Sequence, residues 1–138
     1  MCIPFMKDVS ALSIRPNHKR EVGINMETRL ITQDLRMLGI GRQYLGYNIT
    51  VTAVRMAIGD ENCLLCVKQC IFKPLSEQNH CDWRTIERNI RTVIHRAWNV
   101  NQTYLNELAG YPLHQEPTVT EFVEMLSAHV LQECRHRS

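Results

Sequence analysis

A chain of 138 residues suits one domain with its own hydrophobic core, or one domain with a short appendage. Hydrophobic residues make up 44% of the chain and the net charge is only +2, so bulk charge gives no argument for nucleic-acid binding. No apolar run is long enough to span a membrane, and the N-terminus lacks the features of a signal peptide. We therefore expect a cytoplasmic protein with no membrane partner.

The N-terminal part of the chain is expected to precede the folded domain. Residues 15–25 (RPNHKREVGIN) are polar and interrupted by proline and glycine, which predicts a linker. We therefore divide the chain into an N-terminal segment, residues 1–25, and a helical domain, residues 26–138.

Helical periodicity is the main pattern in this domain. Apolar residues recur at helical spacing between Glu27 and Leu38, and Gly39 then ends the predicted helix. Residues 48–59 (NITVTAVRMAIG) are rich in β-branched residues typical of strands, but their apolar positions also fit one face of a helix. Because a lone strand would have nothing to pair with, we predict a helix here too.

Residues 60–72 (DENCLLCVKQCIF) predict a third helix with acids in its first turn, and Pro74 can begin a short new helix. Cys63 and Cys66 form a C-x-x-C motif, but a structural zinc site needs four converging ligands and the chain has no second such motif. Together with Cys70 they lie on one helical face, where free cysteine is a good small core residue. We expect no metal, no other cofactor and no disulfide framework.

The C-terminal half continues the helical pattern. Asp82 is a plausible N-cap for the helix that follows it, and residues 103–109 predict a short helix. Thr118 and Glu121 have the spacing of a capping box at the start of a last helix. The expected buried stripe of this last helix is Phe122, Met125, Leu126 and Val130, with His129 as a partly buried packing residue.

The stretch Trp83–Trp98 (WRTIERNIRTVIHRAW) concentrates basic residues. On a helix, its basic side chains fall within roughly 60° of one another. They are Arg84, Arg88, Arg91 and His95. The opposite side is apolar, which predicts a helix with one basic and one buried face. Like charges at this spacing repel and only Glu87 lies beside them, so the pattern favours a negatively charged partner.

A short helix near Pro74, a polar turn and a long helix with a basic outer face are typical of a helix-turn-helix, whose second helix enters the major groove of double-stranded DNA. Arginine offers a fork of donors that suits phosphate oxygens and guanine. On pattern alone three interpretations stay open: nucleic-acid binding, which is favoured, a solvated basic face, and a protein-interaction helix. Arg96 points away from the basic side and is interpreted as a solvated charge, and Trp98 as a packing residue.

Several segments resemble one protein family. TIERNIRTVIHRAW (85–98) resembles the recognition helix in the C-terminal DNA-binding domain of sporulation initiation response regulators, the stage-zero sporulation protein A family. LGIGRQYLGY (38–47) resembles the Gly-rich turn of that family, and AGY (109–111) and PTVTEF (117–122) also resemble family segments. The resemblance covers roughly residues 29–134.

This resemblance implies an all-α domain of about six helices that binds as a tandem homodimer to short promoter boxes and regulates transcription, with RNA polymerase as a further partner. Glu87, Arg88 and Arg91 match DNA-contacting positions of the family. We expect Arg88 and Arg91 to bind bases or phosphates. Arg84 and His95 extend the phosphate contacts, and Glu87 accepts from cytosine N4 or orients an arginine.

The chain departs from the family pattern at three positions beside these residues. Arg84 stands where the family has Ser, Thr85 where it has Arg, and Thr92 where it has His. These changes predict a different DNA sequence preference. Ahead of the domain, residues 3–15 (IPFMKDVSALSIR) resemble the end of a receiver domain, but the acceptor aspartate of a receiver has no counterpart. We therefore expect an effector domain with a receiver remnant. We also expect that aspartyl phosphorylation does not switch this chain.

Two other classes of function are weighed against DNA binding. The alternative is a helical interaction module that has lost specific DNA binding and modulates a full-length regulator. An enzyme is not expected, because the sequence shows no Ser/His/Asp set, metal motif or Gly-rich phosphate loop, and its histidines are dispersed. We therefore predict a cytoplasmic, nucleoid-associated DNA-binding regulator.

Overall fold

The computed structural model describes the backbone of residues 18–137 and the side chains of residues 26–136. Helices account for all the regular structure in this part of the chain, which confirms the all-α prediction. They are α2 (His18–Met37), α3 (Gly46–Gly59), a 3-10 turn (Glu61–Leu65), a π-helical turn (Lys68–Phe72), α4 (Lys73–Gln78), α5 (Trp83–Val100), α6 (Gln102–Ala109) and α7 (Val119–Arg137). None of the described helices is both long and apolar enough to cross a membrane.

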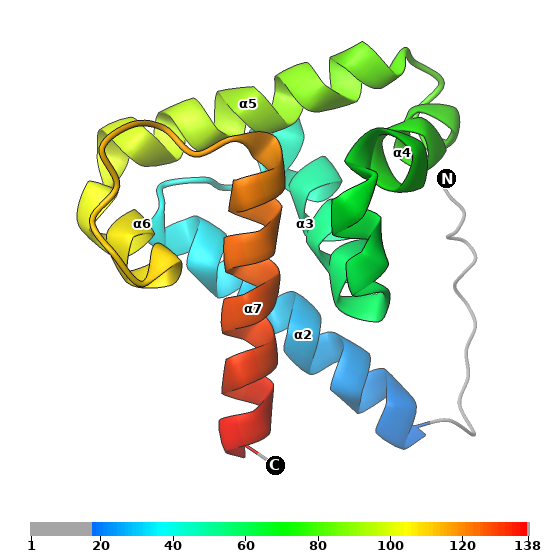
Figure 1. The fold of residues 1–138 in the computed structure, drawn as a ribbon. Coiled ribbons are helices and arrows are strands. Elements are labelled where there is room, and N and C mark those ends of the chain that lie inside the picture. The colour runs from blue at the N-terminus through cyan, green and yellow to red at the C-terminus, as the bar shows by residue number, and fades with distance from the viewer. Residues whose placement is uncertain (1–17, 138) are drawn as a thin grey trace.

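Helix α3 lies at the centre of the fold. It packs against α5, α7 and α2, and Figure 1 shows α5 crossing one end of the molecule while α2 and α7 extend away from it. Ala53 and Val54 are fully buried, and Thr50 is buried as well. The β-branched residues of this segment are therefore helical because tertiary packing on several sides outweighs their weak strand preference. The predicted helix is confirmed.

Helix α2 begins earlier than the sequence predicts. Residues 18–25, expected in a linker, continue the helix as its first two turns. The prediction of irregular structure there was wrong, because a single glycine, Gly23, costs only about 1 kcal/mol in a helix that its neighbours favour. The expected receiver remnant and residues 15–17 of the predicted linker lie outside the described residues. The boundary between residues 25 and 26 remains a prediction.

The predicted third helix, residues 60–72, is broken into two shorter turns. Asp60 caps the 3-10 turn by accepting from the backbone N–H of Asn62, and Cys66 follows with non-helical dihedral angles of φ −143° and ψ 66°. Cys63 and Cys70 are half-buried, but Cys66 is exposed. The expectation that all three cysteines lie in the core was wrong for Cys66, because the break at this residue turns it outward.

The helix boundaries predicted from capping residues are confirmed. Asp82 caps α5 by accepting from the backbone N–H of Arg84 at 3.1 Å. Thr118 and Glu121 form the reciprocal capping box of α7, with N···O distances of 2.9 and 3.1 Å. Gly110 ends α6 with a φ of 86°. On the predicted stripe of α7, Phe122, Leu126 and Val130 are fully buried and Met125 is half-buried.

A buried polar cluster joins α2, α6 and α7. The hydroxyl of Tyr104 donates to one carboxylate oxygen of Asp34 at 2.5 Å, and Nδ1 of His129 lies 2.8 Å from the other. Asp34 is only 3% exposed. Burial raises the pKa of Asp34, while the hydrogen bonds from Tyr104 and His129 oppose that shift. His129 is thus a partly buried residue, as predicted, but it binds a carboxylate as well as packing.

Helices α3 and α5 approach most closely at Gly46. A Cβ atom placed on this residue would lie 2.5 Å from the carbonyl oxygen of Asn89 and 2.6 Å from Cγ2 of Val93, both on α5. Contacts this short do not occur in folded proteins, so the absence of a side chain at Gly46 sets the distance between the two helices.

We expect Tyr104→Phe to destabilise the protein by about 1–3 kcal/mol, because one oxygen of the buried Asp34 carboxylate loses its donor. Urea unfolding followed by circular dichroism measures the change. Tyr111→Phe is the matched control, since Tyr111 is exposed, and its stability should equal that of the wild type. Equal stability of the two variants would contradict the role assigned to the cluster.

Gly46→Ala should destabilise the fold by about 1–3 kcal/mol, because α5 must shift to accommodate the added methyl group. Gly59→Ala is the matched control at the other end of α3, where nothing lies within 4 Å of the added atom. The measurement is the urea midpoint of both variants at equal unfolding slope. A wild-type midpoint for Gly46→Ala would show that the two helices are not held at this distance.

Candidate nucleic-acid interface

The helix-turn-helix predicted from the sequence is formed by α4, a four-residue turn and α5 (Figure 1). The turn is closed by the backbone N–H of Cys81, which donates to the carbonyl of Ser76 at 3.0 Å. His80 adopts the left-handed conformation within it, with a φ of 55°. Pro74 lies in the first turn of α4, as expected for a residue that begins a helix. The chain therefore reverses tightly before α5 begins.

The first residue of α5 is held by packing. The ring of Trp83 stacks on that of Phe72, with centroids 6.3 Å apart and planes within 5° of parallel. Nζ of Lys68 lies 4.3 Å and Cζ of Arg84 lies 5.0 Å from the centroid of the Trp83 ring. This aromatic cluster connects the segment before α4 to the start of α5. The sequence gave no signal for the contact between Lys68 and Trp83.

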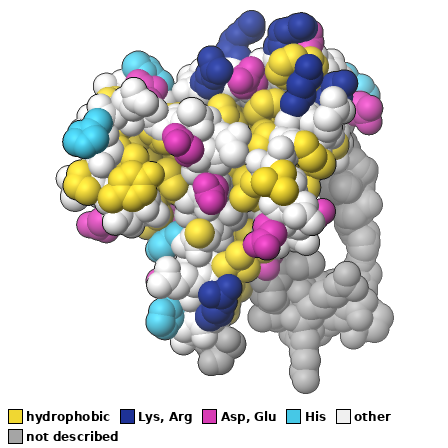
Figure 2. Space-filling view, in the orientation of Figure 1, with side chains coloured by type: hydrophobic (Ala, Val, Ile, Leu, Met, Phe, Trp, Pro, Cys, Tyr) yellow, Lys and Arg dark blue, Asp and Glu magenta, His cyan; other side chains and the backbone are white. Residues whose placement is uncertain are grey.

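Helix α5 has the two faces that its sequence predicts. The buried residues are Ile86, Ile90, Val93, Ile94 and Ala97. Arg84, Arg88, Arg91 and His95 are exposed on the other side, and Figure 2 shows Lys and Arg side chains gathered at the edge of the molecule where α5 runs. The apolar face is buried in the core, so the basic face contacts solvent and is available to a binding partner.

Three of these four basic residues are paired with acids. The guanidinium of Arg84 lies 3.2 Å from Asp82, and that of Arg91 lies 2.9 Å from Glu87. Nδ1 of His95 lies 2.7 Å from Glu116, in the segment between α6 and α7. All three side chains stay about two-thirds exposed, at 67%, 70% and 68%. Exposed pairs of this kind contribute about 0–1 kcal/mol each, so another anion can replace the acid at small cost.

Arg88 differs from its neighbours. Within the described part of the chain, its guanidinium has no hydrogen bond or ion pair. It lies on the same exposed face, between the residues that are paired. A ligand can therefore bind Arg88 without breaking any contact inside the protein.

Electrostatics at the start of α5 keep Asp82 ionised. The backbone N–H of Arg84 donates to Asp82 and lowers the pKa of that carboxyl, and the guanidinium of Arg84 acts in the same direction. Asp82 therefore binds both the backbone N–H of Arg84, as a helix cap, and its guanidinium, as an ion-pair partner.

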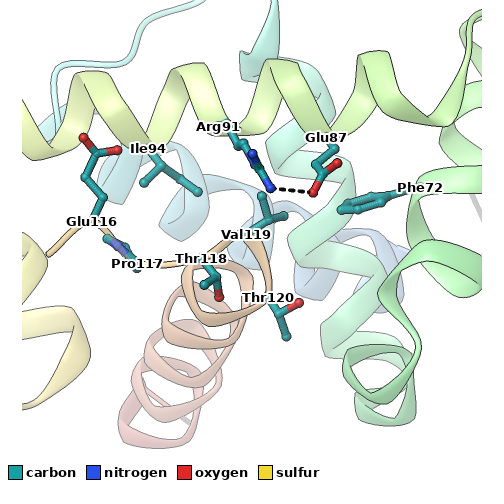
Figure 3. Close-up of a pocket in the computed structure, with 9 residues that line it drawn as sticks. All are labelled: Phe72, Glu87, Arg91, Ile94, Glu116, Pro117, Thr118, Val119 and Thr120. Carbon is teal, nitrogen blue, oxygen red and sulfur yellow. Dashed lines mark hydrogen bonds and ion pairs between the residues drawn. The ribbon is translucent and has the colours of Figure 1, made fainter.

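A pocket of about 330 Å³ opens beside α5. Figure 3 shows its lining, with the Glu87–Arg91 ion pair on one side and the first turn of α7 on the other. The lining residues are Phe72, Glu87, Arg91, Ile94, Glu116, Pro117, Thr118, Val119 and Thr120. Two carboxylates against one guanidinium make its walls unfavourable for an anion. The pocket instead shows that Glu87 is turned toward α7 and held there by Arg91.

Arg96 is exposed, as expected for a solvated charge. The sequence did not predict that its Nε donates to the carbonyl of Gly39 at 3.4 Å, or that its guanidinium lies 5.4 Å from the Tyr44 ring centroid. Glu116, the partner of His95, was not predicted, because it lies 21 residues away in a segment with no periodicity. Trp98 is half-buried against the core, as predicted.

No group of three or more His, Cys, Asp or Glu residues in the described part of the chain is placed to hold a metal ion.

Comparison with known proteins assigns the domain. No curated protein sequence matches the chain. The family model described as "Sporulation initiation factor Spo0A C terminal" matches residues 31–130, which include α3, α4, α5 and α6 and parts of α2 and α7. The match covers more than half of the chain, includes the whole helix-turn-helix, and agrees with the all-helical fold. The chain therefore belongs to the family of the C-terminal domain of the sporulation initiation factor Spo0A, which is a DNA-binding domain of a transcription regulator.

Proposed function

We propose that this protein binds specific DNA sequences by inserting α5 into the major groove and thereby regulates transcription during sporulation. The observation that carries the proposal is the outward basic face of α5, directly after a tight helix-turn-helix, in a domain of a DNA-binding family. The major groove admits one α-helix, and the N-terminal half of a recognition helix contacts the base edges.

The proposed roles of the basic residues follow from their contacts. Arg88 is the first candidate for a base or phosphate contact, because its guanidinium has no ion pair among the described residues that would have to be broken. Arg91 reaches DNA after exchanging Glu87 for a phosphate or guanine, and Glu87 is then able to accept from cytosine N4. Arg84 and His95, near the two ends of the basic face, are proposed phosphate contacts.

The wider context is proposed on the family resemblance. The domain, residues 26–138, binds as a homodimer in tandem on promoter boxes, and RNA polymerase is a further partner. This activity places the protein in the cytoplasm with the nucleoid. The N-terminal segment, residues 1–25, has no proposed role in DNA contact.

Arg88→Ala should weaken binding to a sporulation-type promoter fragment by about 1–3 kcal/mol. Fluorescence anisotropy with this fragment and with scrambled DNA, at several salt concentrations, measures it. Wild-type affinity should fall steeply with salt, because phosphate binding releases counterions. Arg29→Ala is the matched control, since it removes the same charge from the exposed surface of α2, and its affinity should stay near that of the wild type. Equally weak wild-type binding to both DNAs would favour the interaction-module alternative.

Glu116→Gln should strengthen DNA binding by roughly twofold to fivefold at low salt, because it removes an acid that pairs with His95 and repels phosphates. The same anisotropy titration measures the gain, which should shrink as salt rises. Glu124→Gln, on the exposed side of α7, removes the same charge without touching α5. A gain of equal size in both variants would mean that only net charge matters and that His95 is not a DNA contact.

A further inference from the structure

Two cysteines in the turn before α4 lie in contact. Sγ of Cys66 and Sγ of Cys70 are 2.9 Å apart, and one thiol donates to the other. The backbone N–H of Cys70 also donates to the carbonyl of Cys66 at 2.9 Å. Cys66 is exposed and Cys70 half-buried, so reagents in solution reach the pair. This pair takes no part in the proposed DNA contact.

The backbone at Cys66 allows the two sulfur atoms to approach further. A disulfide bond is about 2.05 Å long, so they need to move closer by less than 1 Å. Inside a regular helix such a move strains the backbone. Here Cys66 lies between the 3-10 turn and the π-helical turn and has non-helical dihedral angles, so the bond does not form inside a regular α-helix.

We propose that Cys66 and Cys70 are a redox modification site that forms a reversible intramolecular disulfide by exchange with a low-molecular-weight disulfide. The thiolate of one cysteine attacks a sulfur of the small disulfide, whose S–S bond breaks, and one small thiol leaves. The second cysteine loses its proton and attacks the protein sulfur of this mixed disulfide. The Cys66–Cys70 bond forms and the second small thiol leaves, so two protein thiols are oxidised while one small disulfide is reduced.

The contact between the thiols also affects the rate of exchange. The hydrogen bond with Cys70 raises the pKa of the Cys66 thiol above its ordinary value. Because only a thiolate attacks, exchange should accelerate as the pH rises through and above the ordinary thiol range.

The position of the pair gives the modification a structural consequence. Lys68 lies between the two cysteines, and its Nζ covers the ring of Trp83 at the start of α5. Phe72, two residues after Cys70, stacks on the same ring. A bond between Cys66 and Cys70 constrains the turn from which Lys68 and Phe72 contact the ring of Trp83.

Tryptic mapping of the full chain tests the proposal, because trypsin cleaves after Lys68, between the two cysteines. A Cys66–Cys70 bond keeps the peptide that ends at Lys68 joined to the peptide that begins at Gln69. The chain carries Cys63→Ser and Cys81→Ser, so that each peptide keeps one cysteine, and is incubated with oxidised glutathione at several pH values before alkylation. The joined pair should be the main oxidised product, form faster at higher pH, and disappear with dithiothreitol.

Matched variants complete the experiment. Cys70→Ser should abolish the joined pair and leave glutathione bound at Cys66, whereas Cys134→Ser should leave the joined pair unchanged. The wild-type chain, with its peptides sequenced by fragmentation, repeats the test with every cysteine present. Stable glutathione adducts on both Cys66 and Cys70 without a joined pair, or a Cys66 that does not react, would overturn the proposal.

Discussion

Helices α3 and α5 approach each other closely at Gly46, and this close approach positions α5 on the domain. Because no side chain separates the helices there, α5 lies close enough for its whole apolar face to be buried against α3 and its neighbours. Because the apolar face of α5 is buried, the basic residues on its opposite side are exposed to solvent. The same core that stabilises the domain thus orients its proposed DNA-binding surface, and the two properties cannot be separated at this interface.

Electrostatics on the exposed face of α5 reflect a compromise between folding and binding. Three arginines on one face repel each other, and the acids beside Arg84 and Arg91 reduce that repulsion in the free protein. Pairs so exposed are weak, and phosphates can replace the acids. The arrangement stabilises the free domain modestly while keeping the basic face available to a polyanion.

The sequence predicted best what depends on local chemistry. Asp82, the capping box of α7 and the two faces of α5 each follow from spacing within one or two helical turns, and the structure has them as expected. The composition of α3 alone fits a strand as well as a helix, and it was predicted to be helical because a lone strand would have nothing to pair with. The misses depend on distant contacts or on small energy differences: Glu116 beside His95, the outward turn of Cys66, and the early start of α2. DNA contacts of individual residues remain predictions.

Two of the positions that are expected to depart from the family pattern make contacts within α5 or with its cap. Thr92 donates its hydroxyl to the carbonyl of Arg88 at 3.1 Å, so its one donor is already used within α5. Arg84 is held by Asp82 at the start of the helix. In the proposed complex, the hydroxyl of Thr92 therefore has no donor left for DNA, whereas the guanidinium of Arg88 has no partner among the described residues and is the first group available to it.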